Sequence, residues 1–255
     1  MLLVAALFIT PGPASATGKY SDPADVNRRI EQLRQGSPSL VKVHKMAVTP
    51  GGREMLMIEI GKGGTTVPAV LVTANMTGTT PVATEAALSL ATRILADASM
   101  SAGRTWFILP VGNPDAYARY FTRPLWSDPG NATPFNDDTD DQADEDGYND
   151  LNNDGLITQM RVKAHDGIWM PVEGEPRLMR RADAVKGEKG IYKLYTEGID
   201  DDGDGQYNED TPGGTNVNIN FPHLFKSFGK RSGLYPGSTP EAEALLKFAF
   251  AHPEL

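Results

Sequence analysis

Pro68-Ala-Val-Leu-Val-Thr-Ala74 is a nearly continuous apolar run with the length of one β-strand. Such a run is typical of a strand that is covered on both faces, so we expect it inside a sheet. Pro81 then stands where a helix begins, and apolar residues recur at helical spacing over 82–99. A second strand, Thr105-Trp-Phe-Ile-Leu-Pro110, completes a strand–helix–strand unit with a parallel strand pair. The chain is therefore predicted to be an α/β protein.

The ligand crevice of such a sheet lies at the carboxyl ends of its strands. In this sequence those ends are Ala74–Thr80 and Pro110–Asp115. We therefore expect the functional site to include these two segments.

On the N-terminal side, residues 22–35 are predicted to form a short helix that ends at Gly36-Ser37-Pro38. Strands are predicted over 41–46 and 55–60, and Pro50-Gly51-Gly52 between them is typical of a hairpin turn.

On the C-terminal side, the periodicity disappears from 121 to 215, except in short pieces at 156–162 and 190–195. A helix is predicted over 241–250, opened by a hydroxyl cap and a first-turn proline. The length of 255 residues favours one domain over 17–255, with an acidic loop insertion at about 124–214.

The first residues have the pattern of a secretory signal. An apolar run, 2–9, is followed by Ala14-Ser15-Ala16, which predicts a signal peptide over 1–16 with Thr17 as the new N-terminus. The positive charges that usually open such a signal are missing, so a lipid-facing anchor or a wrongly assigned start are the alternatives. No other segment is long and apolar enough to suggest a membrane span. We expect a secreted or periplasmic protein, without disulfides because the chain has no cysteine.

The formal charge of −9 is concentrated in two stretches. Residues 136–154 carry nine acidic side chains and 200–210 carry six, with no Lys or Arg in either. The other 18 acidic residues are outnumbered by 24 basic ones. Such blocks are usually disordered or neutralised by a bound partner. No basic stripe interleaved with aromatic residues is present, so we do not expect nucleic acid to be a partner.

The first acidic stretch ends in a pattern that is typical of calcium loops. Oxygen ligands occur at positions 1, 3, 5 and 9, with Gly155 at position 6 for the sharp turn. The ligands would be Asp150, Asn152, Asp154 and Thr158. Arg161 replaces the acid at position 12, so the site is incomplete or weaker, or is closed by a residue from elsewhere.

The second stretch repeats the pattern and resembles thrombospondin-type calcium repeats. Its candidate ligands are Asp200, Asp202, Asp204, Asn208 and Asp210. A looser third cluster consists of Asp138, Asp140, Asp144 and Asp146. The alternative is a solvated acidic loop, but two matches in one chain favour structural calcium.

Four further segments, in order, make the chain resemble the zinc carboxypeptidase family of metallopeptidases. They are Gly52-Arg53, Asn113-Pro114-Asp115, Asn216-Val-Asn218-Ile219-Asn220-Phe221-Pro222 and Ser238-Thr-Pro240-Glu241. The resemblance implies a mixed, eight-stranded α/β sheet with helices on both faces. It also implies zinc, a peptide or protein substrate, and hydrolysis of C-terminal residues from peptides.

The zinc pair of that family, His-x-x-Glu, is substituted here. Thr77 stands at the position of the His and Thr80 at that of the Glu, and neutral hydroxyls are poor zinc ligands. None of the four histidines has Glu three residues later, and we interpret them as surface or packing residues.

The segment that grips the substrate carboxylate in this family is also altered. Asn218 is kept, but Ile219 replaces the Arg, which removes a bidentate charged contact. Arg123 is a candidate substitute for the Arg that stabilises the transition state, with a solvated surface residue as the alternative. The resemblance places the third zinc ligand, the substrate Tyr and the general-base Glu beyond Leu255, where a truncated sheet would expose an open edge.

Three functions follow from these patterns. The first is an exported metallocarboxypeptidase-family protein whose zinc site is degenerate. The second is a non-catalytic module, ordered by calcium, that binds peptides or cell-surface partners. The third is a hydrolase with another residue set, although no G-x-S-x-G motif and no cysteine supports it.

Overall fold

The computed structural model describes residues 19–64, 67–134, 136, 143–144, 147–201, 203, 205, 207–208 and 214–255. The helices are α1 (Pro23–Gly36), α2 (Pro81–Ala96), α3 (Ala98–Ser101), α4 (Pro114–Tyr120) and α5 (Pro240–Ala251), with short 3-10 turns η1 (Ala184–Lys186) and η2 (Val217–Ile219). The strands are β1 (Val41–Val48), β2 (Glu54–Ile60), β3 (Ala69–Thr73), β4 (Thr105–Leu109), β5 (Gln159–Lys163), β6 (Trp169–Val172), β7 (Glu175–Arg181) and β8 (Tyr192–Thr196). The predicted signal segment, 1–16, lies outside the described residues.

The first sheet has the strand order β1-β2-β4-β3 and is mixed. β2 is antiparallel to both β1 and β4, whereas β3 and β4 are parallel, with Ala69 opposite Thr105 and Thr73 opposite Leu109. The strand–helix–strand unit predicted from the sequence is therefore confirmed, and so is the α/β class.

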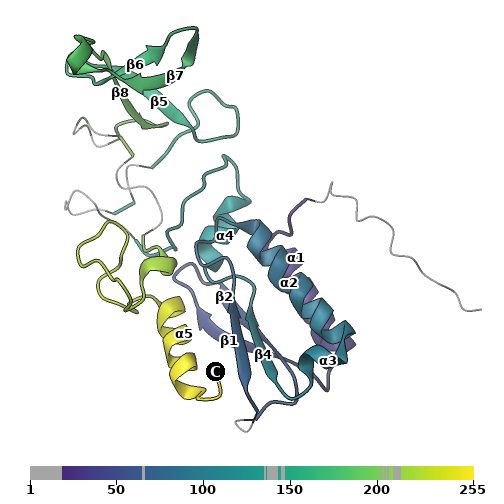
Figure 1. Ribbon diagram of the computed structural model, residues 1–255. Helices are drawn as coiled ribbons and strands as arrows, with labels where there is room; N and C mark the ends of the chain where they lie inside the picture. Colours follow the sequence, from purple (N-terminus) through teal and green to yellow (C-terminus); the bar gives the residue numbers. More distant parts are fainter. Residues whose placement is uncertain are drawn as a thin grey trace, which may run out of the picture.

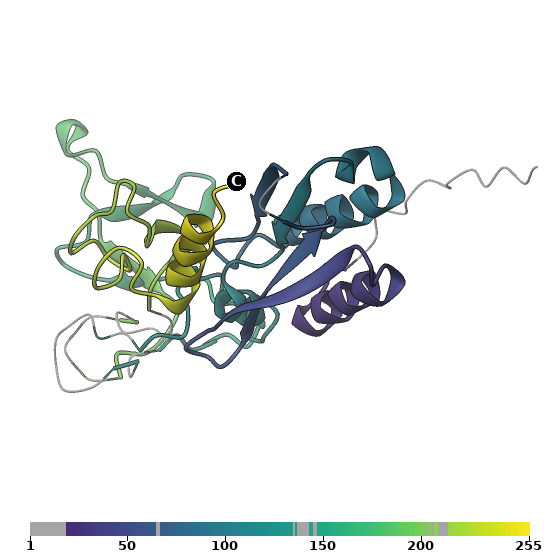
Figure 2. The same ribbon diagram turned by 90° about the horizontal axis from the view of Figure 1, so that it is seen from below.

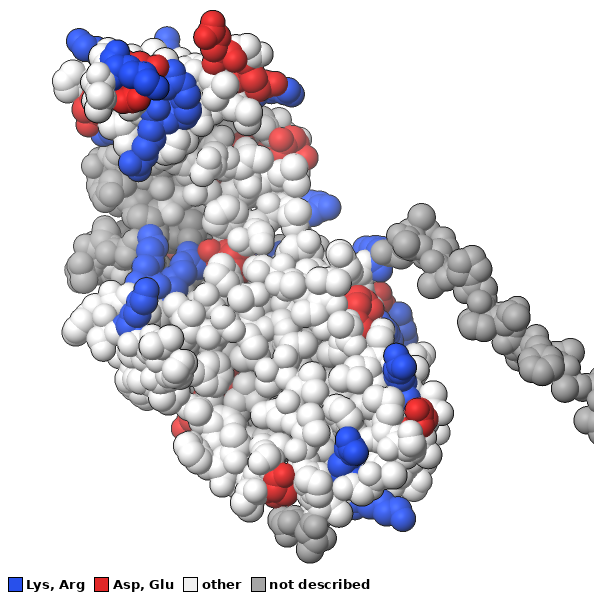
Figure 3. All heavy atoms as spheres, in the orientation of Figure 1, with Lys and Arg blue, Asp and Glu red and all other residues white. Residues whose placement is uncertain are grey.

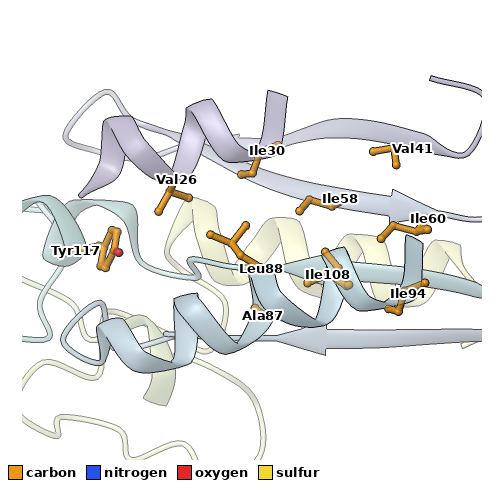
Figure 4. Close-up of a cluster of buried hydrophobic side chains, with 11 residues drawn as sticks. Val26, Ile30, Val41, Ile58, Ile60, Ala87, Leu88, Ile94, Ile108 and Tyr117 are labelled. Carbon is orange, nitrogen blue, oxygen red and sulfur yellow. The ribbon is translucent and has the colours of Figure 1, made fainter. Parts of the chain in front are cut away.

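Helices cover both faces of this sheet, as Figures 1 and 2 show. Successive residues of a strand point to opposite faces, so Ile58 and Ile60 of β2 pack under α1 and α2, and Met55 and Met57 pack against α5. Figure 4 shows the first of these cores, with Val26 and Ile30 of α1 facing the sheet. Each fully buried side chain of this size contributes about 1.5–3 kcal/mol of hydrophobic stabilisation. The prediction of helices on both faces is correct.

The helices begin where the sequence pattern places them. Asp22 caps α1 by accepting a hydrogen bond from the Asp25 amide at 2.9 Å. Thr239 caps α5 by accepting one from the Ala242 amide at 3.2 Å. Both caps precede a proline in the first turn, where a missing N–H costs nothing.

The strand expected inside the sheet, β3, lies at its edge. The Thr105 amide donates to Pro68 O and the Ala74 amide donates to Leu109 O, so alternate residues of β3 face β4. On the other side, the Ala69 amide donates to Glu254 O. An apolar run indicates that a strand is covered above and below the sheet, but it does not indicate how many strands lie beside it. The side chains of β3 are mostly half-buried.

The region expected to be an acidic loop insertion contains a second sheet. Four antiparallel strands in the order β5-β8-β6-β7 form it, above the first sheet in Figure 1. In the part of the chain that the structure describes, the eight strands divide into two sheets of four, and the first of these is the mixed sheet that helices cover on both faces. Backbone bridges join Leu125 to Leu156 and Tyr148 to Gly198 at the base of the insertion.

No helix in the described part of the chain has the length and apolar character that crossing a bilayer requires.

Candidate cleft and acidic loops

The loop after β3 is held in shape by one buried side chain, Asn75. Its backbone is left-handed, with φ of 48°, and its Oδ1 accepts a hydrogen bond from the Thr80 amide at 2.9 Å. Its Nδ2 donates to Thr84 Oγ1 at 3.0 Å, and that hydroxyl donates to Pro110 O at 3.0 Å. The two predicted crevice segments, at the ends of β3 and β4, are therefore joined.

Gly78 packs this loop tightly against the first turn of α4. Its φ is +73°, and a Cβ there would lie 2.5 Å from the Ala116 Cβ and 2.7 Å from the Tyr117 amide nitrogen. Only glycine satisfies both the conformation and the contact.

Three threonine hydroxyls lie together on this loop. Thr77 Oγ1 is 3.5 Å from Thr80 Oγ1, and it accepts a hydrogen bond from Thr79 Oγ1 at 3.1 Å. The structure thus brings together Thr77 and Thr80, the two positions that the sequence singled out. Both side chains are at least partly accessible to solvent.

Asp115 joins two motifs that lie far apart in the sequence. Its buried carboxylate accepts hydrogen bonds from Thr49 Oγ1 at 2.7 Å, Gly51 N at 3.0 Å and Arg53 Nη1 at 3.0 Å. The Ala132 amide donates to it as well, at 3.1 Å. The Gly-Arg turn and the Asn-Pro-Asp segment are therefore one structural unit.

Asn113 completes that unit by capping α4. Its Oδ1 accepts a hydrogen bond from the Ala116 amide at 3.1 Å, and its Nδ2 donates to Pro129 O at 2.8 Å. The Asn-Pro-Asp motif thus positions backbone segments and leaves no charged group pointing into solvent.

Asn131 and Glu241 form a buried contact between the start of the insertion and α5. Asn131 Nδ2 lies 3.3 Å from both Glu241 carboxyl oxygens, and its Oδ1 accepts hydrogen bonds from the Thr133 and Thr215 amides. Burial, with a smaller contribution from the nearby Asp115 carboxylate, raises the pKa of Glu241. The sequence motif Ser238–Glu241 located this acid, but no sequence signal pointed to Asn131.

Asn218 lies at the surface on η2. Its amide donates to Asn216 Oδ1 at 3.0 Å, and its side chain is exposed, as is that of Ile219. Asn220, in contrast, is fully buried, donates to Ser232 O and Tyr235 O, and accepts from the Thr239 amide. Asn220 therefore shapes the approach to α5, and Asn218 is the accessible residue of this segment.

Arg123 is exposed and lines a surface hollow with Tyr20, Tyr120 and Phe121. Within the described residues, no hydrogen bond or ion pair links Arg123 or Asn218 to Thr77 or Thr80. These four candidate positions therefore do not form one bonded cluster.

A sequence profile decides the family. The profile of the zinc carboxypeptidases matches residues 26–154, half of the chain. The chain belongs to the zinc carboxypeptidase family. No curated protein matches the sequence.

Solved structures show the same fold at low identity. This zinc carboxypeptidase family member is similar to carboxypeptidase A from Helicoverpa armigera, with a TM-score of 0.55 and 15% identity over 92% of this chain and 44% of that one. It is also similar to bovine thrombin-activatable fibrinolysis inhibitor in complex with tick carboxypeptidase inhibitor, with a TM-score of 0.50 and 11% identity. That match covers 92% of this chain and 58% of the other. The chain thus spans about half the length of these neighbours.

The side chains of Thr77 and Thr80, where the resemblance places the zinc pair, do not fit the metal that the family implies. Thr77 and Thr80 offer neutral hydroxyls, whereas zinc prefers imidazole, thiolate and carboxylate ligands. Among the residues that the structure describes, no group of three or more His, Cys, Asp or Glu is arranged to hold a metal ion. Two of the histidines have other contacts, because His44 pairs with Glu59 and the His252 ring stacks on Phe248.

The two acidic loops of this family member share one local geometry. Asp150 accepts hydrogen bonds from the Asp154 and Gly155 amides at 3.1 and 2.8 Å. Asp200 accepts from the Gly203 and Gly205 amides at 2.7 and 3.0 Å. In both loops, the acid at position 1 thus binds the amide of the glycine at position 6.

The remaining candidate ligands are partly described. Asn152 accepts a hydrogen bond from the Asp154 amide, and Asp154 accepts one from the Leu156 amide. Asn208 is buried and donates to Thr196 O at 2.7 Å. Asp202, Asp204 and Asp210 of the second loop, and Asp138, Asp140 and Asp146 of the looser cluster, lie outside the described residues.

Glu197, at the end of β8, is the carboxylate that the sequence pattern missed. It accepts hydrogen bonds from the Leu151 amide at 2.9 Å, and from the Thr158 amide and hydroxyl at 3.1 and 2.9 Å. Burial opposes its charge, but these hydrogen bonds outweigh burial and hold the pKa of Glu197 below its usual range. A residue from elsewhere therefore lies beside the loop in which Arg161 occupies position 12.

Proposed function

We propose that this protein is an exported zinc carboxypeptidase homologue that keeps the peptide-handling scaffold of the family but does not bind zinc through its Thr77 and Thr80 positions. The observation that carries the proposal is the loop after β3. Contacts of Asn75 and Gly78 fix the conformation of this loop. The two positions where the family has His and Glu carry instead the Thr77 and Thr80 hydroxyls, 3.5 Å apart. Family membership supports peptides as the class of ligand.

The energetic argument concerns the first two zinc ligands. A catalytic zinc takes three protein ligands and keeps an open position for water. Replacing an imidazole and a carboxylate with two neutral hydroxyls removes the negative charge and the nitrogen donor on which affinity depends. One remaining ligand from elsewhere would not hold zinc at physiological concentrations.

The test is a pair of substitutions at the zinc position. Thr77→His with Thr80→Glu restores the family's pair, and Thr77→His with Thr80→Gln is the control that lacks the carboxylate. Zinc per protein is measured by elemental analysis after equilibrium dialysis of the full chain, and release of C-terminal residues from peptides is assayed in parallel.

We expect the unaltered protein to retain well under one zinc per chain and to release no C-terminal residues. The His/Glu variant should bind zinc at least about tenfold more tightly than the His/Gln control. Stoichiometric zinc with peptide cleavage in the unaltered protein would show that the proposal is wrong.

A second candidate function, a non-catalytic module ordered by calcium, is favoured by the shared geometry of the acidic loops. Asp150 and Asp200 make the same contact with the glycine at position 6, and Glu197 approaches the first loop from β8. A cation bound within each loop would relieve the repulsion among the carboxylates of that loop.

Calcium binding is tested by melting the chelator-treated protein with and without calcium. A ligand that binds only the folded state raises the melting temperature, and Asp150→Asn, which can keep the hydrogen bond to Gly155, should reduce the rise. The same melting temperature at about 1 mM calcium would exclude this role. Export itself is tested by the N-terminus of the mature protein, which should be Thr17.

A further inference from the structure

One face of the second sheet carries a row of side chains that crosses all four of its strands. The register pairs Lys163 of β5 with Tyr192 of β8, Tyr192 with Trp169 of β6, and Trp169 with Arg181 of β7. Residues directly opposite each other in antiparallel strands point to the same face, so the row is cation, ring, ring, cation. Arg161, two residues before Lys163, points the same way.

Cation–ring contacts fix two of these cations over the sheet. The Arg161 guanidinium lies 5.2 Å from the centre of the Tyr192 ring, and that of Arg181 lies 5.4 Å from the Trp169 ring. Arg161 Nη1 also donates to Pro176 O at 2.6 Å. The charged ends are therefore held in place while Arg161, Lys163 and Arg181 all stay exposed.

These three cations differ from the other basic residues of the sheet, which have acidic partners. Those pairs are Arg177 with Glu175 at 2.7 Å, Arg180 with Glu188 at 2.5 Å, and Lys193 with Asp166 at 2.7 Å. Within the described residues, no ion pair joins Arg161, Lys163 or Arg181 to a carboxylate. Figure 3 shows Lys and Arg side chains interspersed with Asp and Glu on this part of a protein whose net charge is −9.

We propose that the cationic row, formed by Arg161, Lys163 and Arg181, binds an extended acidic segment of a partner protein. Residues two apart on a strand lie about 7 Å apart, which separates Arg161 from Lys163, and the three strand spacings between Lys163 and Arg181 amount to about 14 Å. An extended peptide repeats its side chains on one side at about the same 7 Å, so carboxylates at positions i and i+4 match Lys163 and Arg181. The side chain at i+2 then lies midway between these two cations.

An acidic peptide fits this face better than a single-stranded nucleic acid does. Bases bind such surfaces by stacking on open aromatic rings. Here the Tyr192 and Trp169 rings are already covered by guanidinium groups, so the face offers charge but no stacking platform.

The experiment measures binding of a fluorescein-labelled peptide of alternating Glu and Val to the full chain by fluorescence anisotropy. The test variant is Arg161→Gln, Lys163→Gln and Arg181→Gln. The matched control, Arg177→Gln, Arg180→Gln and Lys193→Gln, changes the net charge equally but removes only cations that have acidic partners. Circular dichroism and melting curves verify that both variants fold.

We expect the test variant to weaken peptide binding about 10- to 30-fold and the control to change it less than about threefold, because each exposed charge pair contributes only a few-fold. Reversing the row with Arg161→Glu, Lys163→Glu and Arg181→Glu should create binding to a Lys-Val peptide. Equal losses in both Gln variants, no peptide binding at about 0.15 M salt, or tighter binding of an oligothymidylate of equal charge would each overturn the proposal.

Discussion

Replacing Asp115 with Asn should be among the most damaging isosteric changes in this protein. The carboxylate is 2% exposed and accepts four hydrogen bonds. Oδ1 receives those of Thr49 and Arg53, and Oδ2 receives those of the Gly51 and Ala132 amides. In the Asp115→Asn variant one of these oxygens becomes an NH2 group, which faces two donors and can accept from neither.

The magnitude follows from counting the groups left without a partner. Each buried donor without an acceptor costs about 1–3 kcal/mol. Of the four donors only the Thr49 hydroxyl is fully buried, so two donors without a partner should cost about 2–4 kcal/mol. Losing the negative charge opposite Arg53 adds little to this cost, because the Arg53 side chain is half-exposed and water screens its charge. For a chain of this size, the melting temperature should fall by about 5–15 °C.

The assay is urea unfolding followed by far-ultraviolet circular dichroism, at neutral pH. Asp166→Asn is the control, since Asp166 pairs with Lys193 at the surface and its loss should leave the free energy of unfolding nearly unchanged. If Asp115→Asn lowers the free energy of unfolding by less than about 1 kcal/mol, the four hydrogen bonds do not hold the hairpin and α4 together as described.

Three further predictions concern other residues of the same region. Because the pKa of Glu241 is raised, the stability that Glu241 contributes is complete below its pKa in the unfolded state and is lost as the pH rises through its pKa in the folded state. Glu241→Gln should remove this loss, which is measured as the free energy of unfolding from about pH 4 to about pH 8. An unchanged pH dependence in the variant would contradict the prediction. The pH dependence that Glu197 contributes has the opposite sign, because its lowered pKa stabilises the fold above the pKa of the unfolded state and this stability is lost as the pH falls. Glu197→Gln should therefore lower the free energy of unfolding at neutral pH and reduce its decline at acidic pH. Gly78→Ala should lower the free energy of unfolding by about 1–3 kcal/mol, through the positive φ and the contact with Ala116, and a neutral effect would show that α4 can move away.

Local sequence patterns were enough to predict most of the first sheet and its helices. The spacing of apolar residues in α2, the capping residues Asp22 and Thr239, and the Gly51-Gly52 turn each act within a few residues, so they can be recognised in the sequence. The edge position of β3 depends on which strands meet, and no local pattern contains that information.

The second sheet was missed for a physical reason. Its strands are exposed or half-buried along most of their length, so the alternation of apolar and polar residues that marks a strand is weak. β7 contains three arginines, and β6 contains Pro171, which argues against a strand by itself. Backbone pairing between the strands and the packing of half-buried side chains hold this sheet, and none of its strand residues is fully buried.

The contacts that matter most at the candidate site join residues far apart in the sequence. Arg53 and Asp115, 62 positions apart, were recognised as separate motifs, and only the fold shows that they form one ion pair. Glu197 lies 39 positions from Thr158, so a pattern of calcium ligands within one loop could not include it. Such pairs become predictable only when the topology is known.

The loop after β3 keeps its shape without the side chains of Thr77 and Thr80, the two positions that we propose for the zinc pair. Its shape depends on Asn75, which binds the Thr80 backbone and Thr84, and on Gly78, which packs on α4. Neither contact passes through the side chain of Thr77 or Thr80, and the Thr80 side chain is exposed. Substitution at these two positions therefore leaves the buried contacts intact, and stability imposes little restraint on their identity. The same independence makes the Thr77→His, Thr80→Glu variant a fair test, because the pair can be restored in a loop that already has its conformation.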